Sequence, residues 1–114
     1  MKKIISIFAL TTLISTASFS QTQMEMNQSA SDDYAKADKK LNRVYGQLTK
    51  TFGGTNKAAL IEVQKVWIKY RDSHCKFACM GYEGGSIYPL MYCGCLTVLT
   101  ENRTKELNDL LEGY

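Results

Sequence analysis

The four cysteines and the single histidine are the residues of this chain with the most specific chemistry. Cys75, Cys79, Cys93 and Cys95 lie in one short stretch, and His74 directly precedes the first of them. Four thiolates could bind zinc, but three residues separate the first two cysteines and one separates the last two, unlike the two-residue spacing of a zinc knuckle. No Cys-x-x-Cys pair supports a redox site. If the chain is exported, the cysteines indicate two disulfides first, with a metal site as the rival interpretation.

The pairing of the cysteines depends on the fold of the chain between them, and three connectivities are possible. A glycine-rich turn lies near residue 85. In an antiparallel hairpin, two residues that face each other lie at equal distances before and after the turn, so their residue numbers add up to about the same value for every facing pair. Nested bridges, Cys75–Cys95 and Cys79–Cys93, fit this rule best. Cys93 and Cys95 would point to opposite faces of a regular helix. The second bridge therefore requires an irregular helix near Cys93, or a helix that ends before Cys79, and the first bridge is the stronger prediction.

Catalysis would need partners that the sequence does not supply. His74 could act as a base only beside an activated serine or cysteine, so we expect a surface or packing histidine. Several polar residues lie on or beside apolar stripes, and we expect them to form structural ion pairs, with Arg71 or Arg103 paired to Asp38 or Asp72. These structural polar residues are Asp38, Asn42, Arg71, Asp72 and Arg103. The sequence thus predicts no enzyme, no cofactor and no metal site.

Tyrosines and glycines surround the turn of residues 81–92, which is the candidate binding surface. Glycines allow the backbone to adopt positive φ angles, and aromatic side chains on a positioned loop are typical of recognition surfaces. The candidate binding residues are Tyr82, Glu83, Ser86, Tyr88 and Tyr92. The alternative is that these rings only close the end of a thin core.

Apolar residues that recur every three or four positions predict a first helix ahead of this region. It would begin near Thr22, where Thr22 and Glu25 fit a capping box, and end at Phe52 before two glycines. A break between Ser29 and Asp32 is the alternative to one continuous helix.

Two further helices would position the cysteines and the turn. The second would begin at Thr55 or Asn56 and end at Gly81. Its predicted stripe comprises Leu60, Val63, Trp67, Tyr70, His74, Phe77 and Ala78, and Ile61, Val66 and Ile68 widen it. The third would begin at Ser86 or Pro89 and continue to about Leu110. No strand pattern occurs, so the predicted fold is an all-α, three-helix antiparallel bundle with a disulfide-stapled hairpin between the second and third helices.

The N-terminal segment has the pattern of a secretory signal peptide. Lys2 and Lys3 precede an apolar run at residues 4–14, and small residues follow. Cleavage after Ser20 would place Ser18 and Ser20 at the two recognition positions, and cleavage after Ser18 is the alternative. The run is too short for a membrane span, which needs about 20 residues. We therefore expect a signal peptide at residues 1–20, a single domain at 21–114, and a periplasmic or secreted protein.

Charge excludes a nucleic-acid partner for the mature domain. Removing Lys2 and Lys3 leaves 12 basic against 11 acidic residues, a net charge near +1. Nucleic-acid binding requires a clustered basic face, which this composition does not provide.

Two sets of residues resemble a known family. The first set is Met26-Asn27, Tyr34, Ala37-Asp38, Leu41-Asn42 and Tyr45. The second is Gln64, Trp67, Tyr70-Arg71-Asp72, Cys75, Glu83 to Ile87, Pro89, Gly94 to Thr97, Leu99-Thr100, Arg103 and Glu106-Leu107. Together they resemble the lysozyme inhibitor LprI-like N-terminal domain family, long described as a domain of unknown function.

This resemblance implies an exported, mostly helical bacterial domain without catalytic residues, and one branch of the family inhibits lysozyme. Ser29 stands where many members have a cysteine, and Cys79 and Cys93 stand where members have small residues. The resemblance therefore makes Cys75–Cys95 the family-like pair. Two functions follow as hypotheses, namely lysozyme inhibition by insertion of the 81–92 loop into the enzyme's cleft, and an envelope interaction module with another partner.

Overall fold

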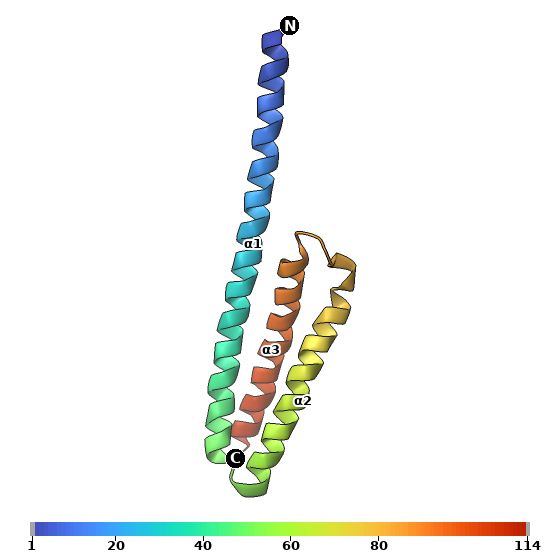
Figure 1. Ribbon diagram of the computed structural model, residues 1–114. Helices are drawn as coiled ribbons and strands as arrows, with labels where there is room; N and C mark the ends of the chain where they lie inside the picture. The colour runs from blue at the N-terminus through green and yellow to red at the C-terminus, as the bar shows by residue number, and fades with distance from the viewer. Residues whose placement is uncertain (1, 114) are drawn as a thin grey trace.

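The computed structural model describes the backbone of residues 2–113 and the side chains of residues 22–113. The elements are α1 (Lys2–Thr51), α2 (Gly54–Ala78), the 3-10 turn η1 (Met80–Tyr82) and α3 (Tyr88–Glu112). Figure 1 shows that the chain reverses direction at each of the two connections. Within the described residues there is no strand, which confirms the predicted all-helical class.

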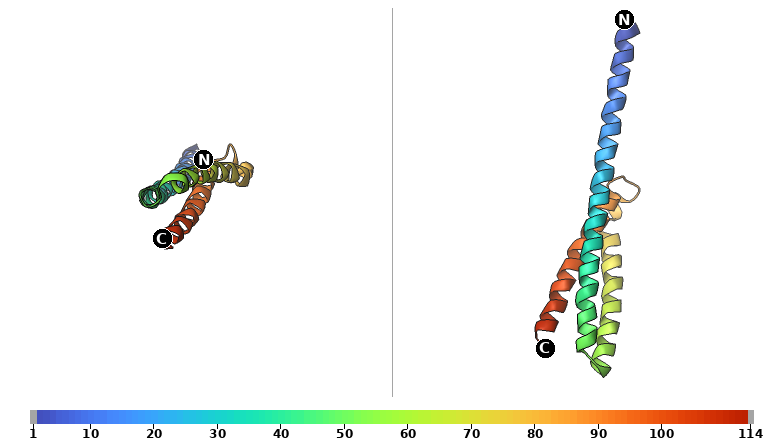
Figure 2. Two further views of the ribbon diagram at one scale, coloured as in Figure 1. Left: turned by 90° about the horizontal axis from the view of Figure 1, so that it is seen from below. Right: turned by 90° about the vertical axis from the view of Figure 1, so that its left-hand side faces the viewer.

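Helix α1 is longer than predicted. It begins at Lys2, well before the predicted start at Thr22. Thr22 therefore does not begin a helix in this chain, and no break occurs between Ser29 and Asp32. The first part of α1 extends beyond the other helices (Figures 1 and 2), which gives the molecule principal extents of 81, 23 and 16 Å. The predicted signal peptide at residues 1–20 lies outside the residues whose side chains are described. Among the described residues, no helix has the length and apolar composition needed to cross a membrane.

The ends of α2 and α3 differ in part from the prediction. Gly53 is the N-cap of α2, without a side-chain cap, so neither Thr55 nor Asn56 caps this helix. The helix ends at Ala78 rather than Gly81, and η1 follows. Ile87 rather than Ser86 precedes α3, with a proline in the first turn as expected.

Helices α1 and α3 approach each other most closely, and small side chains explain how. Ala30 and Ala37 are buried on α1, and Thr100 and Thr104 are buried on α3. Ala37 and Thr104 line one shallow groove between the two helices. Short side chains let two backbones pack at short distance, whereas larger side chains keep α2 farther away.

The main apolar core lies toward the connection between α1 and α2. It consists of Leu41, Val44, Leu48, Leu60 and Leu107, with Tyr45, Phe52, Trp67 and Leu111 packed against it. Burial of apolar area in this cluster is the main favourable term for a domain of this size.

The buried face of α2 coincides only in part with the stripe that the spacing of apolar residues predicts. Val63, Val66, Tyr70 and Phe77 are exposed by 54%, 67%, 55% and 74%. The buried residues of α2 are Leu60, Gln64, Arg71 and Cys75. Of the predicted stripe, Leu60 is buried and Trp67 packs against the core. Two of the four buried residues are polar, so a pattern based on apolar residues places only part of the core correctly.

Candidate functional site

The loop between α2 and α3 is held by a succession of short-range backbone hydrogen bonds. The amide of Tyr82 donates to the carbonyl of Cys79 at 3.0 Å, and that of Gly85 donates to Tyr82 at 3.1 Å. The amide of Tyr88 then donates to Gly85 at 3.2 Å. Each bond closes one turn, so the loop has a defined path rather than an extended one.

Glycine is required at one position of this loop. Gly84 has φ of +78°, in the left-handed region that other residues rarely adopt. At Gly85 a Cβ atom would lie 3.3 Å from the carbonyl oxygen of Tyr82, which leaves little space for a side chain. The backbone therefore confirms the prediction that glycine allows a positive φ angle in this turn.

One disulfide staples the base of the loop. Cys75 and Cys95 are bonded, with 5.7 Å between their Cα atoms, as predicted. The second predicted bridge is wrong, because Cys79 and Cys93 are free thiols. Two residues along a helix correspond to a rotation of about 200°, so when Cys95 faces α2, Cys93 faces away from it. Cys79 lies just beyond the end of α2, as its C-cap.

Helix α1 anchors the far side of the loop. The Asn27 side chain donates a hydrogen bond to the carbonyl oxygen of Ser86 at 2.9 Å. The Gln23 amide donates in turn to the Asn27 side-chain oxygen at 2.9 Å. The loop is thus connected to all three helices, through the disulfide on one side and Asn27 on the other.

The predicted binding residues divide into an outer and an inner group. Tyr82, Glu83 and Ser86 are exposed. Tyr88 and Tyr92 are half-buried and stack on each other, with 5.6 Å between ring centres and 10° between ring planes. The outer group is therefore the more accessible contact surface, and the inner pair is partly covered.

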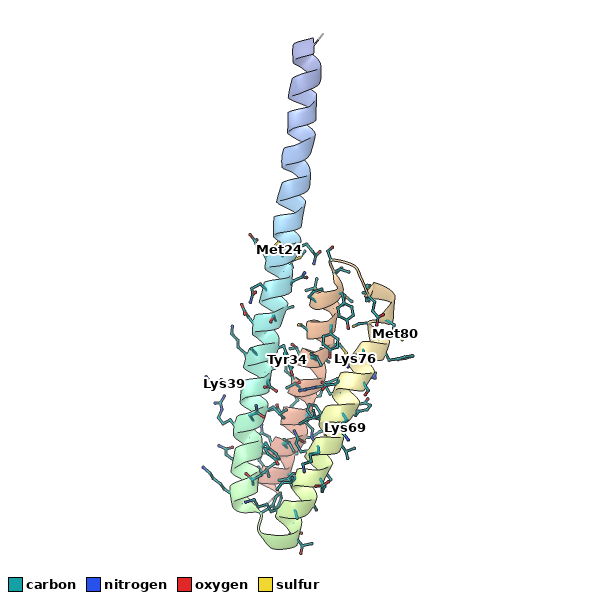
Figure 3. All side chains as sticks on the ribbon, in the orientation of Figure 1. Met24, Tyr34, Lys39, Lys69, Lys76 and Met80 are labelled. Atoms are coloured by element: carbon teal, nitrogen blue, oxygen red, sulfur yellow. A yellow bond between two sulfur atoms is a disulfide. The ribbon has the colours of Figure 1, made fainter. Side chains whose placement is uncertain are left out.

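Arg71 is buried among rings and carboxylates of two helices. Its guanidinium lies 5.3 Å from the Trp67 ring centre and 5.5 Å from that of Tyr34. Nε is 3.0 Å from Asp72, and a terminal nitrogen is 3.7 Å from Asp38. Figure 3 labels Tyr34, which α1 contributes to this cluster. The predicted pairing of Arg71 is present, and the buried cation is both neutralised and stacked.

Arg103, on α3, also lies near the Trp67 ring. Its guanidinium lies 5.8 Å from the ring centre. Nε donates to the buried Gln64 side chain at 3.0 Å, and a terminal nitrogen pairs with Glu106 at 2.8 Å. Arg103 thus pairs with Glu106 rather than with either predicted aspartate. Asn42 is exposed and donates to Asp38 at 3.3 Å.

Burial sets the proton affinity of the groups near this cluster. It raises the pKa of Tyr92, with a further contribution from the negative charge of Asp72. Burial also raises the pKa of Tyr34, where Arg71 opposes the shift and Asp38 adds to it. Burial raises the pKa of the Cys93 thiol, which makes it a poor nucleophile at neutral pH.

A shallow apolar hollow of about 650 Å³ lies beside the loop, between α2 and α3. Its lining includes Tyr82, Met91, Val98 and the disulfide-bonded Cys95. His74 lies at this hollow, is exposed, and has its ring centre 5.6 Å from that of Tyr70. Across the described part of the chain, no three His, Cys, Asp or Glu residues are grouped to hold a metal ion.

Sequence reasoning missed the buried Gln64 and Thr100 as parts of the interior. Gln64 was visible only through the family pattern, in which it precedes Trp67 by three positions. The structure shows that this spacing places both residues against Arg103.

Comparison with known proteins identifies the family. The family model for lysozyme inhibitor LprI matches residues 15–107, so the chain belongs to this family. A protein of Rhizobium meliloti (strain 1021), described as uncharacterised, is 36% identical over 105 residues, covering 81% of this chain and 76% of that protein. No solved structure matches the chain. The matched region includes the whole loop and the arginine cluster, and the Arg71–Trp67–Arg103 arrangement gives the family pattern a structural explanation.

Proposed function

We propose that this chain is an exported helical protein that inhibits lysozyme by inserting the 81–92 loop into the substrate cleft. Family membership supports the general class of activity. The observation that supports the loop as the inserting element is its constraint on both sides, by the Cys75–Cys95 bridge and by the Asn27–Ser86 hydrogen bond. A loop that is already ordered loses little conformational entropy on binding.

The chemistry of the outer residues fits a cleft that contains two catalytic carboxylates. Residues 81–92 contain no lysine or arginine and one carboxylate, Glu83, so the loop would approach the catalytic carboxylates with hydroxyl groups and rings. Glu83 would have to stay outside the cleft, because the two catalytic carboxylates would repel its charge. Tyr82 is 40% exposed and Ile87 is 38% exposed, and both can contribute apolar contact area at the loop. The near-neutral mature chain gives little long-range attraction to a basic lysozyme, so affinity would depend on contacts in the cleft.

The test is a titration of several lysozymes with the purified chain, followed by measurement of cell-wall hydrolysis. We expect inhibition at micromolar or lower concentration. Tyr82→Ala should weaken it by roughly ten-fold or more, as for an exposed aromatic at the centre of an interface. Tyr70→Ala is the matched control, because Tyr70 is also an exposed tyrosine but lies along α2, away from the loop.

Equal losses for Tyr82→Ala and Tyr70→Ala would contradict the loop as the inserting element. An absence of inhibition by micromolar protein would contradict lysozyme inhibition for the enzymes tested. It would then favour the alternative, an envelope interaction module with a different partner.

A further inference from the structure

Helix α2 has an exposed apolar stripe that none of the interactions described above explains. The exposed apolar residues on this stripe are Val63, Val66, Tyr70 and Phe77. In Figure 1 α2 diverges from α1 after their short connection and forms the edge of the molecule away from α1, and Figure 3 labels Lys69 and Lys76 on α2 and Met80 just beyond it, in η1. Neighbouring exposed apolar residues along one face of a helix can mark an interaction surface.

The spacing of this stripe is that of a coiled-coil seam. The exposed residues alternate in steps of three and four, which assigns heptad positions a and d. Position a holds Asn56, Val63, Tyr70 and Phe77, and position d holds Ala59, Val66 and Ser73. All seven side chains are exposed. We call this set the α2 seam.

We propose that the α2 seam binds the α2 seam of a second copy of this chain, with the two helices antiparallel. In an antiparallel pair each a residue lies opposite a d residue of the partner. One register places Tyr70 opposite the partner's Val66, Val63 opposite the partner's Ser73, and Phe77 opposite the partner's Ala59. Each pair then combines a larger with a smaller side chain, which is the arrangement that fills a seam without overlap.

A parallel pair fits less well. It would place Phe77 opposite the partner's Phe77 and Ala59 opposite the partner's Ala59, so one layer would be crowded and another would be empty.

The charges beside the seam support the same register. Glu62, Lys69 and Lys76 occupy position g, are all exposed, and would face the partner's g positions in an antiparallel pair. The register that pairs large with small residues also brings Glu62 opposite the partner's Lys76, once on each side of the two-fold axis. Lys69 faces the partner's Lys69 at the axis, which is the one unfavourable contact. In the single chain Glu62 pairs with Lys65 at 3.4 Å, and both side chains are largely exposed. An exposed ion pair contributes little to stability, so Glu62 can exchange Lys65 for a lysine of the partner.

The self-association of the intact, disulfide-bonded chain can be measured by sedimentation equilibrium between roughly 5 and 500 µM, a range that includes typical weak dimers. We expect a concentration-dependent dimer. Val66→Asp should weaken it by about 100-fold or more, because a carboxylate would be buried in the seam. Val66 is exposed in the single chain, so circular dichroism should show a folded variant. Val98→Asp is the matched control, since Val98 is 56% exposed on α3, outside the seam, and should leave the dimer intact.

Charge reversal tests the register. Glu62→Lys and Lys76→Glu should each weaken the dimer by roughly ten-fold, because each converts two attractions into two repulsions. The double variant E62K/K76E should recover wild-type association to within a few-fold. Lys69→Ala should strengthen the dimer by a few-fold, because it removes the repulsion at the axis.

Several results would overturn this proposal. They are a wild-type chain that stays monomeric at about 500 µM, a dimer unaffected by Val66→Asp, and a double variant that remains as weak as the single ones. Stable binding of another protein to the seam, without self-association, would also contradict it. The proposal does not depend on lysozyme inhibition, because the seam lies outside the 81–92 loop and V66D should inhibit as well as the wild type.

Discussion

Thr100 is fully buried in α3, and within the described residues its hydroxyl oxygen has no hydrogen-bond partner. A buried polar atom without a partner loses its interaction with water and gains nothing in return. Thr100→Val keeps the branched shape and removes this atom, so we expect the free energy of unfolding to rise by about 1 kcal/mol. Urea denaturation would measure the change.

Thr104→Val provides the matched comparison. Thr104 is also buried in α3, but its hydroxyl donates to the carbonyl of Thr100 at 3.0 Å. Removal of a satisfied hydroxyl should give no gain in stability. If both variants gained the same free energy of unfolding, a general preference for valine at buried positions would explain the result. The unpartnered hydroxyl of Thr100 would then not be its cause.

The raised pKa values of the buried tyrosines predict how stability changes at alkaline pH. Tyrosine has an ordinary pKa of 10.0, and the folded chain keeps the protons of Tyr34 and Tyr92 to higher pH. The contribution of these protonated tyrosines to the free energy of unfolding is therefore complete below pH 10. It is lost as the pH rises through their folded-state pKa values, because over that range the unfolded chain binds fewer protons than the folded chain. Urea midpoints between pH 7 and pH 11 should fall above about pH 10.

Two variants separate the groups involved. Tyr92→Phe should reduce the fall above pH 10, because it removes one of the ionising groups. Cys93, with an ordinary pKa of 9.0 that burial raises, should contribute at slightly lower pH, and Cys93→Ala should remove that part. An alkaline fall that was unchanged in Tyr92→Phe would contradict the role of Tyr92.

Among the elements, the hairpin of α2 and α3 depends most on a covalent bond. The Cys75–Cys95 bridge closes a loop with a sequence separation of 20. Cys75→Ser combined with Cys95→Ser should lower the free energy of unfolding by about 3 kcal/mol, because the unfolded chain regains the freedom of this loop. Cys93→Ala is the control and should have a smaller effect.

A thiol count under denaturing conditions checks the same assignment. We expect two free thiols for each chain, those of Cys79 and Cys93. A count of zero would mean that a second bridge forms, and a count of four would mean that neither bridge is present.

The helices illustrate what an apolar pattern can and cannot predict. The all-helical class, the end of α1 and the Cys75–Cys95 pair followed from spacing, because these features depend on local turns and on hairpin geometry. The buried face of α2 did not follow from the spacing of apolar residues, because this face includes the cationic Arg71. The side chains that make this burial tolerable, Asp38 and Tyr34, lie on another helix, and no local pattern contains that information.

The candidate site was predictable in composition but not in detail. The glycines indicated a tight turn, and Gly84 adopts the positive φ expected of one. The sequence could not separate Tyr82 from the stacked pair Tyr88 and Tyr92, because that division depends on the end of α2 at Ala78 and on the packing of α3. The contact from Asn27 to Ser86 spans 59 positions and leaves no local signal.

At the scale of the whole molecule, the two ends of the chain differ in what surrounds them. The contact between Asn27 and Ser86 places the start of the proposed mature chain beside the 81–92 loop, whereas α3 ends at the opposite end of the helices (Figure 1). A purification tag or a surface linkage on the mature N-terminus would therefore crowd the loop and obscure partner binding. The same attachment at the C-terminus would leave the loop open to solution. A binding assay for partners of the loop should therefore use a chain that is tagged at its C-terminus.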